Sequence, residues 1–359
     1  MAFTTIDVPH IYFNTLVWTG NNASSRAFTG LGFQANMMWS KNRTSGHQHN
    51  LVDTVRGVDS RLLTPSDNND EDTTCTHGHF DSLDNDGFTI TSAGGSYNVN
   101  RNDNAFVGWF WKAETSFTND ASSTGIGSID STGSVNTTSG FSIVSWTGTG
   151  SAGTIKHGLS SAPSWIMIKN RDSDEAWPVY HVGNTSAPAT EQIYLNLNNA
   201  TADSASQWND TAPTSSVFTV GSSTESNKSS SPMIAYCWSE IKGYSKFGGY
   251  VGNGTANGPF VYTGFKPAFL MLKRTDSADS WLMSDNKRTG VGNGQNYNVL
   301  ADAVDNEDGG TGDRHDFLAN GFAIKNAWSR INADGGTYIY MAFAEEPFVS
   351  STGIPGTAR

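Results

Sequence analysis

Short runs of apolar and aromatic residues alternate with clusters of Gly, Asn, Asp, Ser and Pro along almost the whole chain. Such runs, bounded by turn-forming residues, predict β-strands. No window of about a dozen residues keeps a helical period without an interrupting Gly, Pro or Asn. We therefore predict an all-β fold. In the middle of the chain the predicted strands cover residues 142–146, 164–169, 177–181, 192–196, 217–220 and 233–240.

The same series of strands recurs three times, at intervals of about a hundred residues, which indicates one unit duplicated twice. The segments around Trp39, Ile168 and Met271 are expected to be equivalent strands of three superposable folds. Six or seven strands in about a hundred residues is typical of a β-sandwich or jelly roll. Each repeat closes on an aromatic strand with an acidic end, at 106–114, 233–240 and 338–346.

These repeats predict three tandem β-sandwich or jelly-roll-like modules. Between the first two lies a stretch of 26 residues, of which 17 are Ser, Thr or Gly, a composition typical of flexible linkers. Module one is therefore expected to be the more independent, with modules two and three docked through 243–249. The predicted boundaries are 1–114 for module one, 115–140 for the linker, 141–243 for module two, 244–349 for module three and 350–359 for a tail.

The strands at 165–168 and 269–272 are apolar on both faces. Because alternate residues of a strand point to opposite faces, one face is expected to form the module core. Another module or another subunit should cover the other face. Together with the low charge density, these strands favour a homo-oligomer, with a trimer as the first expectation and a ring-like array as the alternative.

Composition narrows the class of protein. Only 16% of the 359 residues are charged, against about 25% in average soluble proteins. With 38 Gly and 11 Trp, this suits extracellular or virion-exposed β proteins. A net charge of −12 argues against nucleic acid as the main ligand.

Targeting features are also informative. The start of the chain has no basic and apolar segment of the secretory type, and apolar runs such as 106–111 are too short for membrane insertion. Cys75 and Cys237 fall at unmatched places in different repeats. They are therefore expected to be reduced thiols, as in a protein that folds in a cytoplasm.

Three segments resemble a known family: 236–248, 258–269, and 320–322 together with 335–345. They are similar to repeated β domains in structural proteins of marine tailed phages, including cyanophages and pelagiphages. The resemblance extends from 7–13 to 353–355 and thus covers nearly the whole chain. It implies a location in the virion and supplies no catalytic residues.

The sequence therefore favours a phage virion structural protein, made in the host cytoplasm and associated with other virion proteins. A tail-fibre or other host-facing appendage subunit that acts in adsorption is the first expectation. A capsid or head decoration protein is the main alternative, and a carbohydrate-active enzyme or an extracellular filament subunit are further ones. An enzyme is not expected. Glu345 and Glu346 are adjacent, so a strand points them to opposite faces, unlike the paired carboxylates of a retaining glycosidase.

Charged residues at the repeated strand ends are predicted to be structural. Glu114, Glu240 and Glu345 are expected to form ion pairs, for example with Lys112 or Lys242. The apolar strand of each repeat also ends in a lysine that should pair with the closing acidic strand. These three lysines are Lys41, Lys169 and Lys273.

No resident cofactor is predicted, but two kinds of metal site are considered. His47 with His49 and His77 with His79 form His-x-His pairs, which on a strand share one face. Trimeric phage fibres sometimes bind iron through such pairs; the alternative is histidines in surface loops. The acidic segments 84–87 and 302–313 offer the oxygen ligands that Ca²⁺ prefers. Their alternative is ordinary turn structure.

Three tryptophans lie near turn-rich segments, namely Trp177, Trp208 and Trp281. If their rings are exposed, they can stack on sugar rings, which predicts binding of a host-surface glycan. The favoured interpretation is that they fill the cores of the sandwiches.

Overall fold

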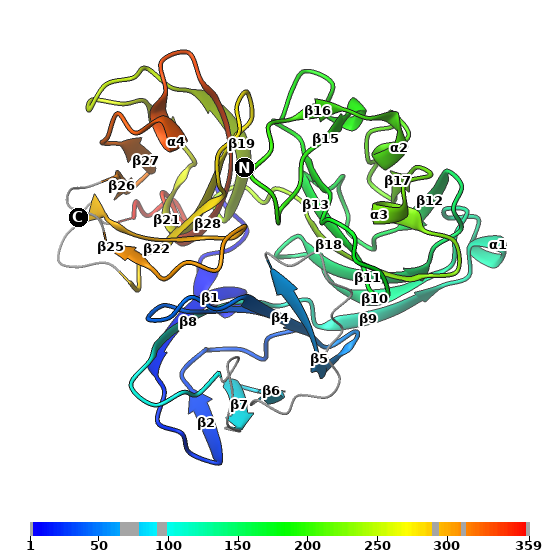
Figure 1. The fold of residues 1–359 in the computed structure, drawn as a ribbon, viewed down its shortest axis with the longest axis horizontal. Coiled ribbons are helices and arrows are strands. Elements are labelled where there is room, and N and C mark those ends of the chain that lie inside the picture. The colour runs from blue at the N-terminus through cyan, green and yellow to red at the C-terminus, as the bar shows by residue number, and fades with distance from the viewer. Residues whose placement is uncertain (1–2, 65–78, 92–98, 289–293, 310–313, 357–359) are drawn as a thin grey trace.

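Three β modules surround a common centre in the computed structural model (Figure 1). The structure describes residues 3–64, 79–91, 99–288, 294–309 and 314–356. Within them the α-helices are single turns of four residues, so the predicted all-β class is confirmed. These helices are α1 (Ala121–Thr124), α2 (Ala205–Trp208), α3 (Thr224–Asn227) and α4 (Ser329–Asn332), with 3-10 turns η1 (Pro9–Ile11) and η2 (Pro188–Thr190).

Each module has one large antiparallel main sheet. Module one orders its strands as β1 (Phe13–Thr19), β8 (Ala105–Trp111), β3 (Met37–Asn42), β4 (His49–Asp53) and β5 (Gly57–Thr64). Module two orders them as β9 (Thr115–Asn119), β10 (Ser131–Asn136), β11 (Phe141–Thr147), β18 (Pro232–Trp238), β13 (Trp165–Asn170) and β14 (Val179–His181). Module three orders them as β19 (Ser245–Val251), β28 (Thr337–Pro347), β21 (Phe265–Arg274), β22 (Leu282–Asp285), β24 (Tyr297–Leu300) and β25 (Asp308–Gly309).

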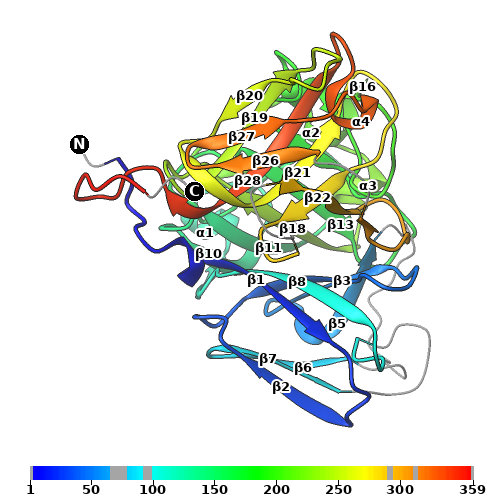
Figure 2. The ribbon, with the colours of Figure 1, turned by 90° about the vertical axis from the view of Figure 1, so that its left-hand side faces the viewer.

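A smaller outer sheet covers the far face of each main sheet, as Figure 2 shows for module one, and completes a sandwich. In module one the outer sheet is β2 (Ser25–Thr29), β7 (Gly87–Thr91) and β6 (Phe80–Asp84). In module two it is β12 (Gly153–Lys156) and β17 (Val217–Val220), and β15 (Glu191–Gln192) pairs separately with β16 (Ala202–Asp203). In module three it is β20 (Phe260–Tyr262), β27 (Gly321–Ile324), β26 (His315–Leu318) and β23 (Gly294–Gln295).

The three repeats have the same pairing scheme. The apolar strands β3, β13 and β21 each lie between the closing strand of their module (β8, β18 or β28) and the strand that follows the repeat lysine. Their registers agree, since the lysines of the three repeats face Val107, Ile234 and Ile339. The segments around Trp39, Ile168 and Met271 therefore lie on equivalent strands, as the repeats predict.

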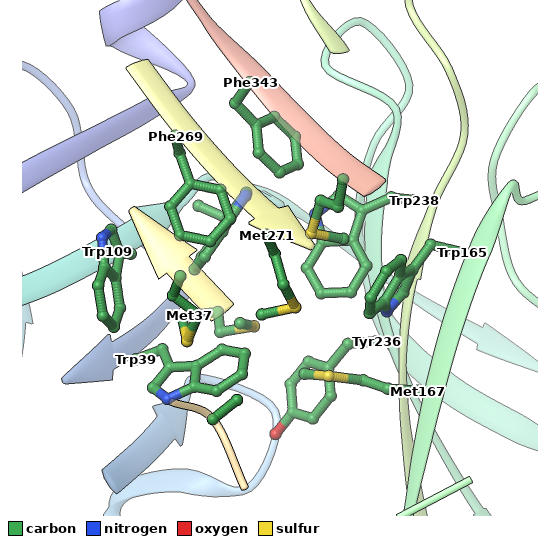
Figure 3. Packing of buried hydrophobic residues seen from close by; sticks show 14 of the residues in the cluster. Met37, Trp39, Trp109, Trp165, Met167, Tyr236, Trp238, Phe269, Met271 and Phe343 are labelled. Carbon is green, nitrogen blue, oxygen red and sulfur yellow. The ribbon is translucent and has the colours of Figure 1, made fainter. Parts of the chain in front are cut away.

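Both faces of each main sheet are buried, but by different partners. On β13, Trp165 and Met167 join a central cluster to which all three modules contribute, whereas Ile166 and Ile168 face the core of module two. The same alternation holds on β21. Figure 3 shows the central cluster, with side chains from each module meeting at one place.

Neighbouring modules of the same chain thus supply the predicted second cover of the apolar strands. The apolar faces that suggested a homo-oligomer are already buried within one chain. Trimer formation remains a prediction, and these strands no longer support it.

The segment 115–140, expected to be a flexible linker, is folded into module two. It contributes β9 and β10 to the main sheet, and Ile129 is buried in the core of the module. Asp120 caps α1 by accepting a hydrogen bond from the Ser123 N–H at 3.0 Å, as expected for an N-cap. At Gly133 an added Cβ would lie 2.1 Å from the Ile143 carbonyl oxygen. The small residues of this segment therefore allow close strand pairing rather than flexibility.

We predict that the three modules unfold together, because the central cluster contains residues of all three. Phe269→Ala should lower the free energy of unfolding by about 3–5 kcal/mol, with strands of modules one and two losing hydrogen-exchange protection in the same transition. Val251→Ala, at a side chain that is 58% exposed, is the control and should have little effect. Separate unfolding of module three would contradict a shared core.

Candidate functional site

The three tryptophans considered for sugar binding are buried. Trp177 and Trp281 belong to the central cluster and Trp208 to the core of module two. The Trp281 indole N–H also donates to the Tyr194 carbonyl oxygen at 2.7 Å, which joins module three to module two. These rings offer no face to a sugar. The core interpretation is therefore correct, and the glycan-binding assignment of these residues is withdrawn.

The first histidine pair does not form a metal site. His49 is fully buried on β4, so it is not a surface-loop histidine either, and both of its ring nitrogens have partners. Its Nδ1 accepts from the Trp39 indole at 2.9 Å, and its Nε2 donates to the Leu300 carbonyl oxygen of module three at 2.9 Å. His47 lies before β4, and its carbonyl oxygen accepts a hydrogen bond from Lys41. Burial and nearby cations lower the pKa of His47, as expected for a structural neutral imidazole.

The second pair cannot be assessed as a pair, because His77 lies outside the described residues. His79 has two side-chain partners: Asp81, 2.7 Å from Nε2, and Thr91, 3.1 Å from Nδ1. Across the described part of the chain, no group of three or more His, Cys, Asp or Glu side chains is placed to hold a metal ion.

The acidic segments considered for calcium make structural contacts where the structure describes them. Asp86 accepts backbone N–H bonds from Gly30 and Gly32 at 3.1 and 2.7 Å, and these bonds lower the pKa of its carboxyl group. Asp302 accepts the Trp281 N–H at 2.9 Å. Both carboxylates therefore join their segments to distant parts of the same module. Residues 310–313 of the second segment lie outside the described residues.

The three repeated lysines are buried, and their roles differ from the prediction. Each ammonium group donates to the carbonyl oxygen six residues later, as for Lys169 and Glu175 at 2.7 Å and Lys273 and Asp279 at 2.7 Å. The predicted pairing with the closing acidic strand is therefore wrong. Burial lowers the pKa of Lys41 and of Lys273 to about 8. Buried ammonium groups are tolerated when hydrogen bonds satisfy them.

Two of these lysines also connect modules. Lys41 of module one donates to the Val304 carbonyl oxygen of module three at 2.9 Å. Lys273 of module three donates to the Asn198 carbonyl oxygen of module two at 3.1 Å. The direction of contact is the same around the ring, as in a molecule with cyclic pseudo-symmetry.

A second set of equivalent residues lies twelve positions after each lysine: Asp53, His181 and Asp285. Each faces the residue four positions before the lysine on the apolar strand, namely Met37, Trp165 or Phe269. Each also accepts the backbone N–H two residues later, at 2.9, 2.9 and 3.0 Å respectively. This set was missed at the sequence level, although the constant spacing from the lysine identifies it.

Each member of this set bonds to the next module. The Tyr236 hydroxyl donates to Asp53 at 2.6 Å, and the Trp109 indole donates to Asp285 at 3.0 Å. His181 instead donates from Nε2 to the Tyr340 carbonyl oxygen at 2.9 Å. The three contacts close a ring of polar interactions around the central cluster.

Two members of the set also form buried ion pairs with arginine side chains. Asp53 binds Arg56 at 2.6 Å and Asp285 binds Arg288 at 2.5 Å, with all four side chains fully buried. Arg288 also binds Glu307 at 3.0 Å, and Glu307 binds Arg43 of module one at 2.7 Å. Buried pairs of this kind cost desolvation energy but fix geometry once every polar group is satisfied.

The acidic strand ends form ion pairs, as predicted, although only one lysine was named correctly. Glu114 pairs with Lys112 at 3.3 Å. Glu240 pairs with Lys246 at 2.7 Å rather than with Lys242, and Glu345 pairs with Lys266 at 2.8 Å.

A pocket with a volume of about 560 Å³ lies between modules one and three. The Ala268 and Ala344 side chains contribute apolar lining. Both Glu345 and Glu346 reach it, although adjacent strand residues normally face opposite ways. A register shift beside Pro267 in the pairing of β21 with β28 accompanies this arrangement. The other polar lining residues include Asp7, His10, Asn14, Asn286 and Lys287.

Comparison with known proteins places the chain in a family. Residues 8–347 match the family model described as "Domain of unknown function (DUF7483)", so the chain belongs to that family. No curated protein matches the chain. None of the helices within the described ranges has the length and apolar character needed to cross a membrane.

The polar contacts between modules predict that removing one hydroxyl group lowers the stability of the protein. Tyr236→Phe leaves the buried Asp53–Arg56 pair without one donor, so the free energy of unfolding should fall by about 1–3 kcal/mol. Tyr262→Phe, at a tyrosine that is 52% exposed, is the matched control and should change it by less than about 0.5 kcal/mol. Urea unfolding of both variants measures this. Equal effects would contradict a role for the hydroxyl at the module boundary.

The buried histidines predict acid sensitivity. Burial lowers the pKa of His157 and of His181 to about 4, so the unfolded chain binds more protons than the folded one between pH 4 and about 6.5. Stability should therefore be retained above about pH 6.5. It should fall by about 1.4 kcal/mol per pH unit for each such histidine as the pH drops toward 4.

Unfolding of His181→Asn at pH 7 and pH 5 tests the contribution of His181. The variant should be less stable at pH 7, because the contact with Tyr340 is lost, yet its stability should depend less on pH than that of the parent protein. An unchanged pH dependence would exclude His181 as a source of the effect.

Proposed function

We propose that this chain is a structural subunit of a phage virion, and specifically a host-facing appendage subunit that acts in adsorption. The resemblance of several segments to repeated β domains of marine tailed-phage structural proteins motivates the proposal. The observation that carries it is the use of buried polar groups. Asp53, His181 and Asp285 bind residues of neighbouring modules, which is the chemistry of assembly rather than of turnover.

A rigid platform of this kind suits adsorption. The shared core fixes the three modules relative to one another, while the outer sheets face away from the centre (Figures 1 and 2). Weak binding at each subunit is sufficient when several copies act together, because avidity can exceed single-site affinity by roughly 10²–10⁴. In this proposal the chain associates with other virion proteins and binds host-surface glycan without cleaving it.

A capsid or head decoration protein is the second candidate. Three equivalent modules around one centre match a threefold position of a shell as well as the axis of a fibre. The two candidates differ in where the chain lies on the particle and in whether it contacts the host.

Labelling of virions and competition for adsorption test the proposal. Antibodies against the purified chain should label the tail or its appendages, and the soluble chain should reduce phage adsorption without releasing sugar from the host surface. Heat-denatured protein is the control. Label confined to the head, with undiminished adsorption, would favour the decoration protein. Released oligosaccharide would favour an enzyme, and absence of the chain from virions would exclude both structural roles.

A further inference from the structure

Two exposed aromatic side chains lie at alternate positions of one strand in the outer sheet of module three. Phe260 and Tyr262, on β20, are 48% and 52% exposed, whereas Val261 between them is buried. Because a strand alternates its side chains, the two rings share the outward face. Their spacing along the strand is roughly 7 Å, from the rise of about 3.4 Å per residue.

The fold does not require aromatic residues at these positions. Tyr262 faces Gly321 on β27, just as Thr29 on β2 faces Gly87 on β7. Ala27 and Thr29 are therefore the counterparts of the aromatic pair in module one. In module two, the paired residues Ile155 and Phe218 correspond to the pair Val261 and Phe322 of module three. The residues on either side of Ile155, Thr154 and Lys156, are therefore the counterparts. Small or polar side chains occupy these places in both other modules.

Charged residues of the same outer sheet lie beside the two rings. Phe260 faces Ala323 across the sheet, and Ala323 in turn faces Asp316 on β26. Lys325 lies 4.0 Å from Asp316. Exposed aromatic rings beside charged groups of both signs can stack on a polyhydroxylated ring and also form hydrogen bonds with it.

We propose that Phe260 and Tyr262 form a stacking site for sugar rings of a neutral glycan. Two half-exposed rings present far less area than the roughly 800 Å² per partner of a stable protein interface, which disfavours a protein partner. The net charge of −12 disfavours an anionic polymer. A neutral oligosaccharide fits both constraints. The site rests on the proposed function, for which it would supply the weak contact that avidity multiplies.

The equivalent residues of module two define the test. The double variant Phe260→Thr, Tyr262→Lys reproduces Thr154 and Lys156, so it should fold with an unchanged melting temperature. Val251→Thr, at an exposed aliphatic residue of the same module, is the matched control. The probes are densely immobilised neutral gluco-, galacto- and manno-oligosaccharides, with a sulfated oligosaccharide as the anionic comparison.

The parent chain and the Val251→Thr variant should bind at least one neutral oligosaccharide, and the double variant should bind it about tenfold or more weakly. Binding by none of the neutral probes, or equal binding by the double variant, would overturn the site. The site would also be overturned if the double variant lost self-association in sedimentation but still bound sugar. The two rings would then form a contact between copies of the chain. Virion labelling is independent of these results, so the stacking site can fail while the structural role stands.

Discussion

The structure depends on one constraint, which is that each main sheet is apolar on both faces. An outer sheet covers only one of them. The other face can leave water only if the three modules close around a common centre, which they do through side chains such as Trp109, Tyr236 and Phe269. Apolar burial of this kind is the main favourable contribution to folding. The three modules are therefore parts of a single folded unit rather than independent domains.

The polar contacts around this centre determine which module adjoins which. Packing alone does not fix which module adjoins which, whereas buried hydrogen bonds impose a cost on any arrangement that leaves them unmade. Asp53, His181 and Asp285 occupy one repeat position and yet bond to the next module through different groups. The geometry of the contact has thus been kept while its chemistry differs among the modules.

Much of this architecture could be predicted from the sequence, because strand patterning and repetition are local signals. The equivalence of the strands containing Trp39, Ile168 and Met271 followed from the recurrence of similar segments in the same order. The sequence favoured burial of Trp177 and Trp208 in a core, but sugar stacking stayed open as an alternative because their turn-rich flanks resemble exposed loops. The segment 115–140 was misjudged for a related reason. Its Ser, Thr and Gly residues suit a linker as well as they suit closely paired strands such as β9 and β10.

Folding three modules from one chain has a consequence that an assembly of three separate subunits would not share. Closure is intramolecular, so the ring does not dissociate into separate modules on dilution. Each outward surface is also encoded separately. A substitution at Thr29, Lys156 or Tyr262 alters one sector of the molecule and leaves the other two unchanged. The chain can therefore change what one sector contacts while the remaining sectors, and the core that holds them, keep their existing roles.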